Sequence, residues 1–250
     1  MTNNYIYFIA NWKMFGFKNA VNHLNKVITL CKTKKYSKAK IVYCPPYTIL
    51  SDLCRKIKKT KIDIGAQNCH EANDFGASTG SINSKMIKDA GAKYVILGHS
   101  ENRSSGESSY LINKKIKSAL SEKLKIIFCI GENLEQRKKK QTIKILKNQI
   151  LKGLKNVKNI KNIFFAYEPI WSIGTGRILE IKQLERDIYL LNKFIVNKYK
   201  SNDIKILYGG SVNPKNINDL KNVKLINGFL IGKASQNQNK LIDIIKKTFN

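Results

Sequence analysis

The amino-acid sequence predicts an α/β fold, a single (β/α)8 barrel over residues 1–250 in which each of eight parallel strands is followed by a helix. Short runs rich in β-branched and aromatic residues alternate eight times with segments whose apolar residues recur three and four positions apart. This alternation indicates a parallel sheet, because each parallel return needs a crossover of about a dozen residues. A length of 250 residues suits one barrel domain.

The expected strands are short and largely apolar. Helical spacing between them is clear at Ile143, Leu146 and Ile150, and no linker rich in Pro, Gly or Ser divides the chain. In chain order, the strands are predicted over Tyr5–Ala10, Ala39–Cys44, Ile62–Ala66, Tyr94–Leu97, Lys125–Ile130, Ile163–Ala166, Lys205–Tyr208 and Gly228–Ile231.

The segment FFAYEPIWSIGTG, residues 164–176, carries the strongest functional signal. Its apolar run ends at Glu168, and Pro169 biases that residue toward extended backbone, so the carboxylate is expected where the sixth strand ends. Catalytic side chains of barrel enzymes lie at that end. Gly174 and Gly176 follow and let backbone N–H groups approach a phosphate closely. Glu168 is therefore predicted to be a base beside an anion site.

The carboxyl ends of other strands also carry polar residues, and in a parallel barrel all these ends face one rim. A lysine beside glycine-rich turns suits a phosphomonoester. A glutamate opposite a histidine suits proton movement next to a carbonyl group. The residues concerned are Asn11 and Lys13 after the first strand, His99 and Glu101 after the fourth, Gly209, Gly210 and Ser211 after the seventh, and Gly232 and Lys233 after the eighth.

The net charge of +29, from 46 Lys+Arg against 17 Asp+Glu, would suit a protein that binds polyanions. The lysines are, however, scattered over the predicted helices and turns and do not gather with aromatic residues on one face. The joint abundance of Lys, Asn and Ile suggests a surface composition set by an A/T-biased genome. We therefore expect no specific nucleic-acid partner.

Other compositional features predict a cytoplasmic protein with no membrane partner. No apolar run approaches the roughly 20 residues of a membrane span, and residues 1–12 lack a basic leader followed by a cleavage site. The five cysteines are odd in number and show no CxxC spacing, which argues against a disulfide framework or a zinc site. We interpret them as reduced, mostly buried thiols.

Seven ordered motifs, which together cover nearly all of the chain, resemble those of the triosephosphate isomerase family. The resemblance implies a TIM barrel that interconverts dihydroxyacetone phosphate and D-glyceraldehyde 3-phosphate through an enediol, in glycolysis and gluconeogenesis. It also implies a homodimer that needs no cofactor and no metal. The motifs are NWKM (11–14), GAQN (65–68), ILGHSE (96–101), CIGE (129–132), YEPIWSIGTG (167–176), YGGSV (208–212) and GFLIGKAS (228–235).

The resemblance also implies catalytic roles, which are those known for this family. Glu168 would take the proton from one carbon and return it to the other. His99, at the start of a short helix, would be neutral and donate a hydrogen bond to the carbonyl oxygen. Asn11 and Lys13 would add hydrogen-bond donors and positive charge around the enediolate.

Further roles that the resemblance implies concern the phosphate and a closing lid. The phosphate would be bound mainly by main-chain N–H groups of Gly174, Ser211, Gly232 and Lys233. The segment Pro169–Leu179, which contains Thr175, resembles the family's lid, which keeps water from the enediol. Trp171 would anchor the lid's first hinge with its indole N–H near Glu132 in the open state, and Tyr208 and Ser211 would hold the closed form.

Five positions depart from the family pattern. Asn102 and Ser81 stand where the family has an arginine and a glutamate that meet across the dimer interface, so both partners of that pair are replaced together. Phe15 replaces an asparagine near the pocket for the neighbour's loop, residues 69–80. Lys233 replaces a glycine, which its amide tolerates if φ is not positive. Leu179 replaces a small residue at the second hinge, which would change the lid's opening rate.

Two alternative functions remain. A related barrel isomerase for a four-carbon sugar phosphate would use the same catalytic residues and differ in pocket width. A catalytically idle basic barrel that binds RNA or another polyanion is disfavoured, because it has no physical need for Asn11, Lys13, His99 and Glu168 together.

Overall fold

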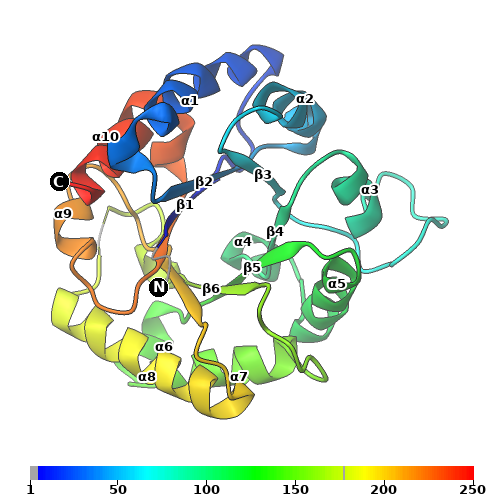
Figure 1. Cartoon of the computed structure of the whole chain (residues 1–250). Coiled ribbons are helices and arrows are strands. Elements are labelled where there is room, and N and C mark those ends of the chain that lie inside the picture. The colour runs from blue at the N-terminus through cyan, green and yellow to red at the C-terminus, as the bar shows by residue number, and fades with distance from the viewer. Residues whose placement is uncertain (1–4, 177) are drawn as a thin grey trace.

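Eight parallel strands close into a barrel in the computed structural model, which describes residues 5–176 and 178–250 (Figure 1). Each strand pairs with its neighbour in chain order, and β8 pairs with β1. The predicted fold class is thereby confirmed. The strands are β1 (Ile6–Asn11), β2 (Ala39–Cys44), β3 (Asp63–Ala66), β4 (Tyr94–Leu97), β5 (Lys125–Ile130), β6 (Ile163–Tyr167), β7 (Lys205–Tyr208) and β8 (Gly228–Ile231).

Three strands have boundaries that differ by one residue from those predicted: β1 at both ends, and β3 and β6 at one end each. β1 starts at Ile6 and runs on to Asn11, because Asn11 still pairs in register with Cys44 of β2. β3 starts at Asp63, which pairs with Val42. β6 includes Tyr167, whose register partner is Ile130 of β5. In β1 and β6, cross-strand pairing therefore carries the ladder one residue closer to the catalytic rim than apolar character alone indicates.

Helices surround the barrel and cover its outer face (Figure 1). The α-helices are α1 (Asn25–Lys32), α2 (Tyr47–Ile57), α3 (Ser84–Asp89), α4 (Ser100–Ser104), α5 (Ser109–Ser121), α6 (Leu134–Lys138), α7 (Thr142–Gly153), α8 (Ile181–Tyr199), α9 (Ile217–Leu220) and α10 (Gln238–Thr248). The 3-10 helices are η1 (Lys18–Leu24), η2 (Lys34–Tyr36), η3 (Ile170–Ser172) and η4 (Lys233–Gln236).

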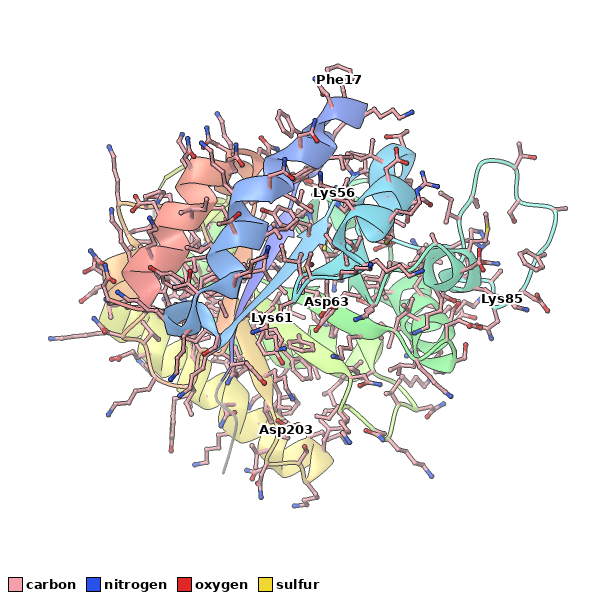
Figure 2. The ribbon with its side chains drawn as sticks, turned by 45° about the horizontal axis from the view of Figure 1, so that its top comes forward. Phe17, Lys56, Lys61, Asp63, Lys85 and Asp203 are labelled. Carbon is pink, nitrogen blue, oxygen red and sulfur yellow. The ribbon has the colours of Figure 1, made fainter. Side chains whose placement is uncertain are left out.

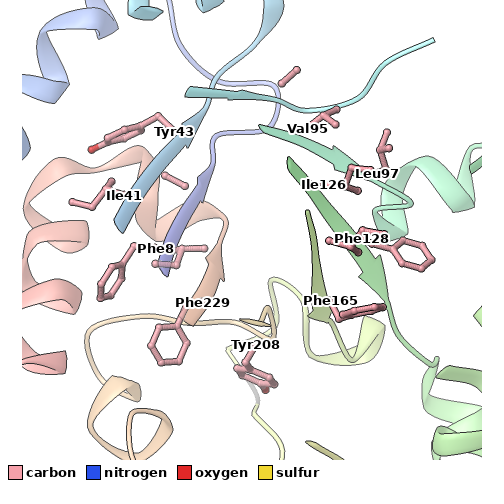
Figure 3. Close-up of a cluster of buried hydrophobic side chains, with 14 of the residues drawn as sticks. Phe8, Ile41, Tyr43, Val95, Leu97, Ile126, Phe128, Phe165, Tyr208 and Phe229 are labelled. Atoms are coloured by element: carbon pink, nitrogen blue, oxygen red, sulfur yellow. The ribbon is translucent and has the colours of Figure 1, made fainter. Parts of the chain in front are cut away.

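The hydrophobic core has two parts because side chains along a strand alternate between the two faces of the sheet. Ile9, Tyr94 and Leu207 belong to the cluster that fills the barrel. The larger cluster lies between strands and helices, and Figure 3 shows Phe128 and Phe165 among its members. Burial of each such side chain contributes roughly 1.5–3 kcal/mol, so the barrel is a rigid frame for the loops at its rim.

The molecular surface carries the excess charge in a scattered form. In Figure 2, long side chains project all around the ribbon, and Lys56, Lys61 and Lys85 lie on different elements. Among the described residues, no helix has the length and apolar character to cross a bilayer. All five cysteines are buried and free, as predicted. Burial raises the pKa of Cys31 to about 11, so that thiol stays protonated at neutral pH.

Candidate active site

The segment that follows β1 holds Lys13 in a fixed, left-handed backbone conformation with φ of 57°. The N–H of Lys13 donates to Oδ1 of Asn11 at 3.1 Å. Its carbonyl oxygen accepts from Nε2 of Gln67 at 2.8 Å, and the carbonyl of Trp12 accepts from Nε2 of Gln236 at 2.8 Å. Two glutamines from distant parts of the chain therefore clamp this segment. The Lys13 side chain extends toward Gly232, where an added Cβ would lie 3.5 Å from Lys13 Cε.

His99 follows β4 and is the N-cap of α4, where it is almost fully buried. Its Nδ1 accepts a hydrogen bond from the N–H of Glu101 at 3.3 Å. An imidazole nitrogen can accept only when it carries no proton, so this bond selects the neutral tautomer with the proton on Nε2. The nearest Glu101 carboxylate oxygen lies 3.6 Å from Nδ1. His99 is thus arranged to donate from Nε2.

Glu168 directly follows β6 and has only 3% of its surface exposed. Its Oε1 lies 3.5 Å from Nε2 of His99, whereas its Oε2 has no hydrogen-bond partner among the described residues. Two glycines leave room for it. A Cβ at Gly131 would lie 1.8 Å from the Glu168 carbonyl oxygen, and a Cβ at Gly209 would lie 2.6 Å from Glu168 Cγ. A buried carboxylate with one unused oxygen is costly, which makes Glu168 a candidate functional residue.

Glu101 is a residue that sequence reasoning placed at the rim without a role. Its Oε1 lies 2.5 Å from Nζ of Lys13. The Glu101 carboxylate is 58% exposed, so this ion pair is screened and adds at most about 1 kcal/mol of stability. Its effect is on position, because it orients the Lys13 ammonium group. The sequence signal that could have indicated this role is the position of Glu101 two residues after His99, at the end of the same strand.

The glycine-rich turns after β7 and β8 are neighbours at the rim, because β7 pairs with β8. Ser211 adopts a left-handed φ of 49°, and its Oγ donates to the Ser172 carbonyl at 2.5 Å and accepts from the N–H of Gly176 at 3.3 Å. Lys233 begins η4 and is not among the described residues with positive φ. Because the φ of Lys233 is not positive, its backbone N–H can take the place of the N–H of the family's glycine.

The lid segment 169–179 is anchored at its start; residue 177 lies outside the described residues. Nε1 of Trp171 donates to Oε1 of Glu132 at 3.3 Å, and the Tyr167 hydroxyl donates to the same oxygen at 3.2 Å. Burial raises the pKa of Glu132, and these bonds together with nearby Arg137 oppose the rise. Arg137 also pairs with Asp187 of α8. Sequence reasoning missed Arg137 and Asp187, since nothing local connects them.

The later part of the lid is held as well. Oγ1 of Thr175 donates to the carbonyl of Ser172 at 3.0 Å, and Leu179 is buried. Tyr208 faces Gly210, where an added Cβ would lie 2.4 Å from its hydroxyl oxygen. The Trp171–Glu132 contact, expected for an open lid, and the contacts of Ser211 with the lid, expected for a closed one, occur here in one arrangement. The Trp171–Glu132 bond therefore does not by itself identify an open lid.

One cavity of about 940 Å³ unites the residues predicted to act on the substrate. All four predicted catalytic residues and all four predicted phosphate-binding residues line it. The predicted lid and hinge residues are not among its lining residues; these are Pro169, Trp171, Thr175, Tyr208 and Glu132. The lining residues in question are Asn11, Lys13, His99, Glu168, Gly174, Ser211, Gly232 and Lys233.

The loop between β3 and α3, residues 69–80, projects away from the barrel (Figure 1). In the segment between β1 and η1, the side chains of Met14 and Phe17 are exposed. Phe15 in the same segment packs edge-on against Trp12, with 6.3 Å between the ring centroids. Ser81 is exposed. These are the segments in which the family pattern predicts contacts with a second subunit.

Comparisons with known proteins agree with this geometry. The model of the triosephosphate isomerase family matches residues 6–248. Triosephosphate isomerase of Thermodesulfovibrio yellowstonii is 36% identical over 244 residues, 96% of this chain and 98% of that protein. The protein of the same name from Alkaliphilus oremlandii is 39% identical over 244 residues, 94% of this chain and 96% of its own.

A solved structure gives the same result. The crystal structure of triosephosphate isomerase from Bartonella henselae superposes with a TM-score of 0.88 at 30% identity, covering 97% of this chain and 98% of that one. The family match, the identity over nearly full length and the shared barrel agree, and the chain belongs to the triosephosphate isomerase family.

Proposed function

We propose that this chain is a triose-phosphate isomerase that interconverts dihydroxyacetone phosphate and D-glyceraldehyde 3-phosphate through an enediolate. One observation carries the proposal. Two nearly buried side chains, Glu168 and His99, place Oε1 and Nε2 within 3.5 Å of each other at the wall of one cavity. A carbon acid and its neighbouring carbonyl oxygen can contact both groups at once.

Glu168 acts as the base. Its carboxylate removes a proton from the carbon beside the carbonyl group, and the electron pair of that C–H bond forms the enediolate with negative charge on the former carbonyl oxygen. The proton of the neighbouring hydroxyl group moves to the former carbonyl oxygen, and the carbonyl group re-forms on the carbon that lost its proton. Glu168 then returns its proton to the former carbonyl carbon, which gives the other isomer. The Oε2 atom, which lacks a protein partner among the described residues, is the oxygen with a lone pair to spare.

His99, Lys13 and Asn11 stabilise the negative charge that develops. The Nε2–H of His99 donates to the oxygen, in the tautomer fixed by the Glu101 amide. The Lys13 ammonium and the Asn11 side chain line the same cavity, where burial strengthens their electrostatic effect. Preorganised donors of this kind act without rearrangement during the reaction.

The phosphate is proposed to bind between the turns after β6, β7 and β8. Gly174, Ser211, Gly232 and Lys233 all line the cavity at this place, which we call the phosphate grip. Contact between the lid and Ser211 closes one side of the phosphate grip. Exclusion of water there protects the enediolate from loss of its phosphate.

We further propose a cytoplasmic homodimer. The exposed apolar side chains of Met14 and Phe17, together with the projecting loop 69–80, support burial against a second copy of the chain. In this arrangement the loop of one subunit supports Lys13 and His99 of the other.

A coupled assay on the purified protein, with triose and tetrose phosphates as substrates, tests the proposed activity. We expect kcat/KM to be far higher with the triose phosphates. Turnover that prefers the four-carbon substrate would favour the related isomerase, and absence of turnover with both would favour a polyanion-binding barrel.

A further inference from the structure

The cavity is larger than the proposed substrate requires. A triose phosphate has ten non-hydrogen atoms, which fill at most about 300 Å³ even at the roughly 30 Å³ that one water molecule takes in the liquid. The cavity measures about 940 Å³. Its additional lining lies beyond the phosphate grip, in residues 212–216 after β7 and in Gln236 and Lys240 after β8. We call this part the outer lobe.

The charge of the cavity favours anions throughout. Among the described residues that line it are four lysines, Lys13, Lys215, Lys233 and Lys240, and one carboxylate, Glu168. Lys13 is paired with Glu101, a residue outside the lining. Two of the other lysines, Lys215 after β7 and Lys240 in α10, line the outer lobe. Two ammonium groups in a part of the cavity whose described lining contains no carboxylate are suited to a phosphoryl group.

The β7 wall of the outer lobe is rigid and continuous with the phosphate grip. The amide groups of Asn213 and Asn216 both donate to the carbonyl oxygen of Ser211, at 3.0 and 2.9 Å. The N–H of Lys215 donates to Oδ1 of Asn213 at 2.8 Å, which fixes the backbone of the lysine. Little backbone freedom is therefore lost when a ligand binds. The same bonds hold Ser211 in its left-handed conformation.

We propose that the outer lobe is a subsite for a second phosphoryl group joined directly to the first. A ligand with two adjacent phosphoryl groups, such as pyrophosphate or a nucleoside diphosphate, places one in the phosphate grip and the next between Lys215 and Lys240. Since it occupies the phosphate grip, it competes with the substrate. The inference rests on the proposed function for the place of the first phosphoryl group.

Binding of inorganic phosphate, pyrophosphate and ADP to the full chain, measured by calorimetry at constant ionic strength without divalent cations, tests this subsite. We expect pyrophosphate to bind at least about tenfold more tightly than phosphate, because two charge-assisted contacts are added. In the double variant Lys215→Gln/Lys240→Gln this preference falls to about threefold or less, while kcat/KM for the triose phosphates changes by less than about twofold.

A matched control removes the same charge elsewhere. Lys224 and Lys246 are exposed, belong to the same region of the chain and do not line the cavity. The variant Lys224→Gln/Lys246→Gln is expected to keep the tenfold preference. If both double variants lose the preference for pyrophosphate equally, the effect is one of net charge and the proposal is overturned. Equal binding of phosphate and pyrophosphate by the unaltered chain would also overturn it.

The ADP measurement identifies the source of the diphosphate. Binding of ADP that depends on Lys215 and Lys240 points to a nucleotide, and failure of ADP beside tight pyrophosphate binding points to a free diphosphate; both keep the subsite. Because calorimetry needs no turnover, a chain that binds pyrophosphate as expected but does not isomerise triose phosphates would contradict the proposed function and leave the subsite standing.

Discussion

Gly209 lies directly against the Glu168 side chain, so that a Cβ at this position would come within 2.6 Å of Cγ and 3.1 Å of Oε1. The glycine after β7 thus sets where the carboxylate at the end of β6 can lie. The Glu168 side chain has room on one side because Gly209 has no Cβ, and on the other side it lies near the buried imidazole of His99.

Gly209→Ala is expected to displace the carboxylate and lower kcat by about tenfold or more, since small misplacements of a base are costly in proton transfer. KM should change little, because the phosphate-binding residues are not moved. Steady-state kinetics measures both. Asn202→Ala is the control, because Asn202 is exposed and precedes β7, at the end of the strand away from the catalytic rim. Equal kinetics for the two variants would contradict the packing argument.

Glu168→Asp withdraws the carboxylate by about one methylene and should lower kcat by on the order of 10² or more, with a far smaller effect on KM. Glu168 contacts the site of proton transfer and not the phosphate, which is the reason for this split. A variant with nearly normal kcat would remove Glu168 from the role of base.

Glu132→Gln tests the effect of burying a carboxyl group behind the lid. Burial raises the pKa of Glu132 above its ordinary value of 4.5, so the folded state holds the proton to higher pH than the unfolded state does. The free energy of unfolding of the unaltered protein should therefore fall, relative to the variant, as pH rises from about 4.5 through the raised pKa.

The amide oxygen of glutamine still accepts from Trp171, so the comparison keeps the hinge contact. Denaturant unfolding at several pH values gives the measurement, and Glu135→Gln on the exposed face of α6 is the control. A difference between the unaltered protein and Glu132→Gln that is constant over this pH range would be inconsistent with a raised pKa.

The homodimer is expected to associate mainly through apolar burial. Ser81 and Asn102 lack the charges of the family's pair, and Phe15 adds apolar surface. Its dissociation constant should change by less than about threefold between low and high salt, because screening acts on charges. Sedimentation at micromolar concentration measures this, and an active monomer there would refute the assembly.

Distant lysines are expected to contribute little to catalysis. At about 0.15 M salt a charge more than roughly 8 Å away is largely screened, so kcat/KM should fall by no more than about tenfold between low and physiological salt. Neutralising Lys138, Lys139 and Lys140 should change kcat/KM by less than about twofold. Lys140 has a φ of 56°, so asparagine is the replacement suited to that position. A large loss with fold and dimer intact would show that the charge is functional.

The sequence predicted the strands and the cavity-lining side chains well because both depend on local patterns. The largely apolar run at residues 125–130 gave β5 with its observed bounds, and the polar residues that follow apolar runs gave Asn11 and Glu168. Contacts between distant segments gave no such signal. Lys13 meets Glu101 across 88 positions, and Arg137 meets Asp187 across 50, and only the closed barrel brings these pairs together.

The bond between Gln236 and the carbonyl of Trp12 joins residues 224 positions apart. During synthesis from the N-terminus, this clamp is therefore made long after the segment that carries Lys13. A nascent chain that lacks β8 and η4 has every predicted catalytic side chain, but it lacks the bond from Gln236 to Trp12 and the strand that closes the barrel on β1. We therefore expect enzymatic activity only after β8 and η4 have been made, and we expect chains that end before β8 to be inactive despite an intact catalytic set.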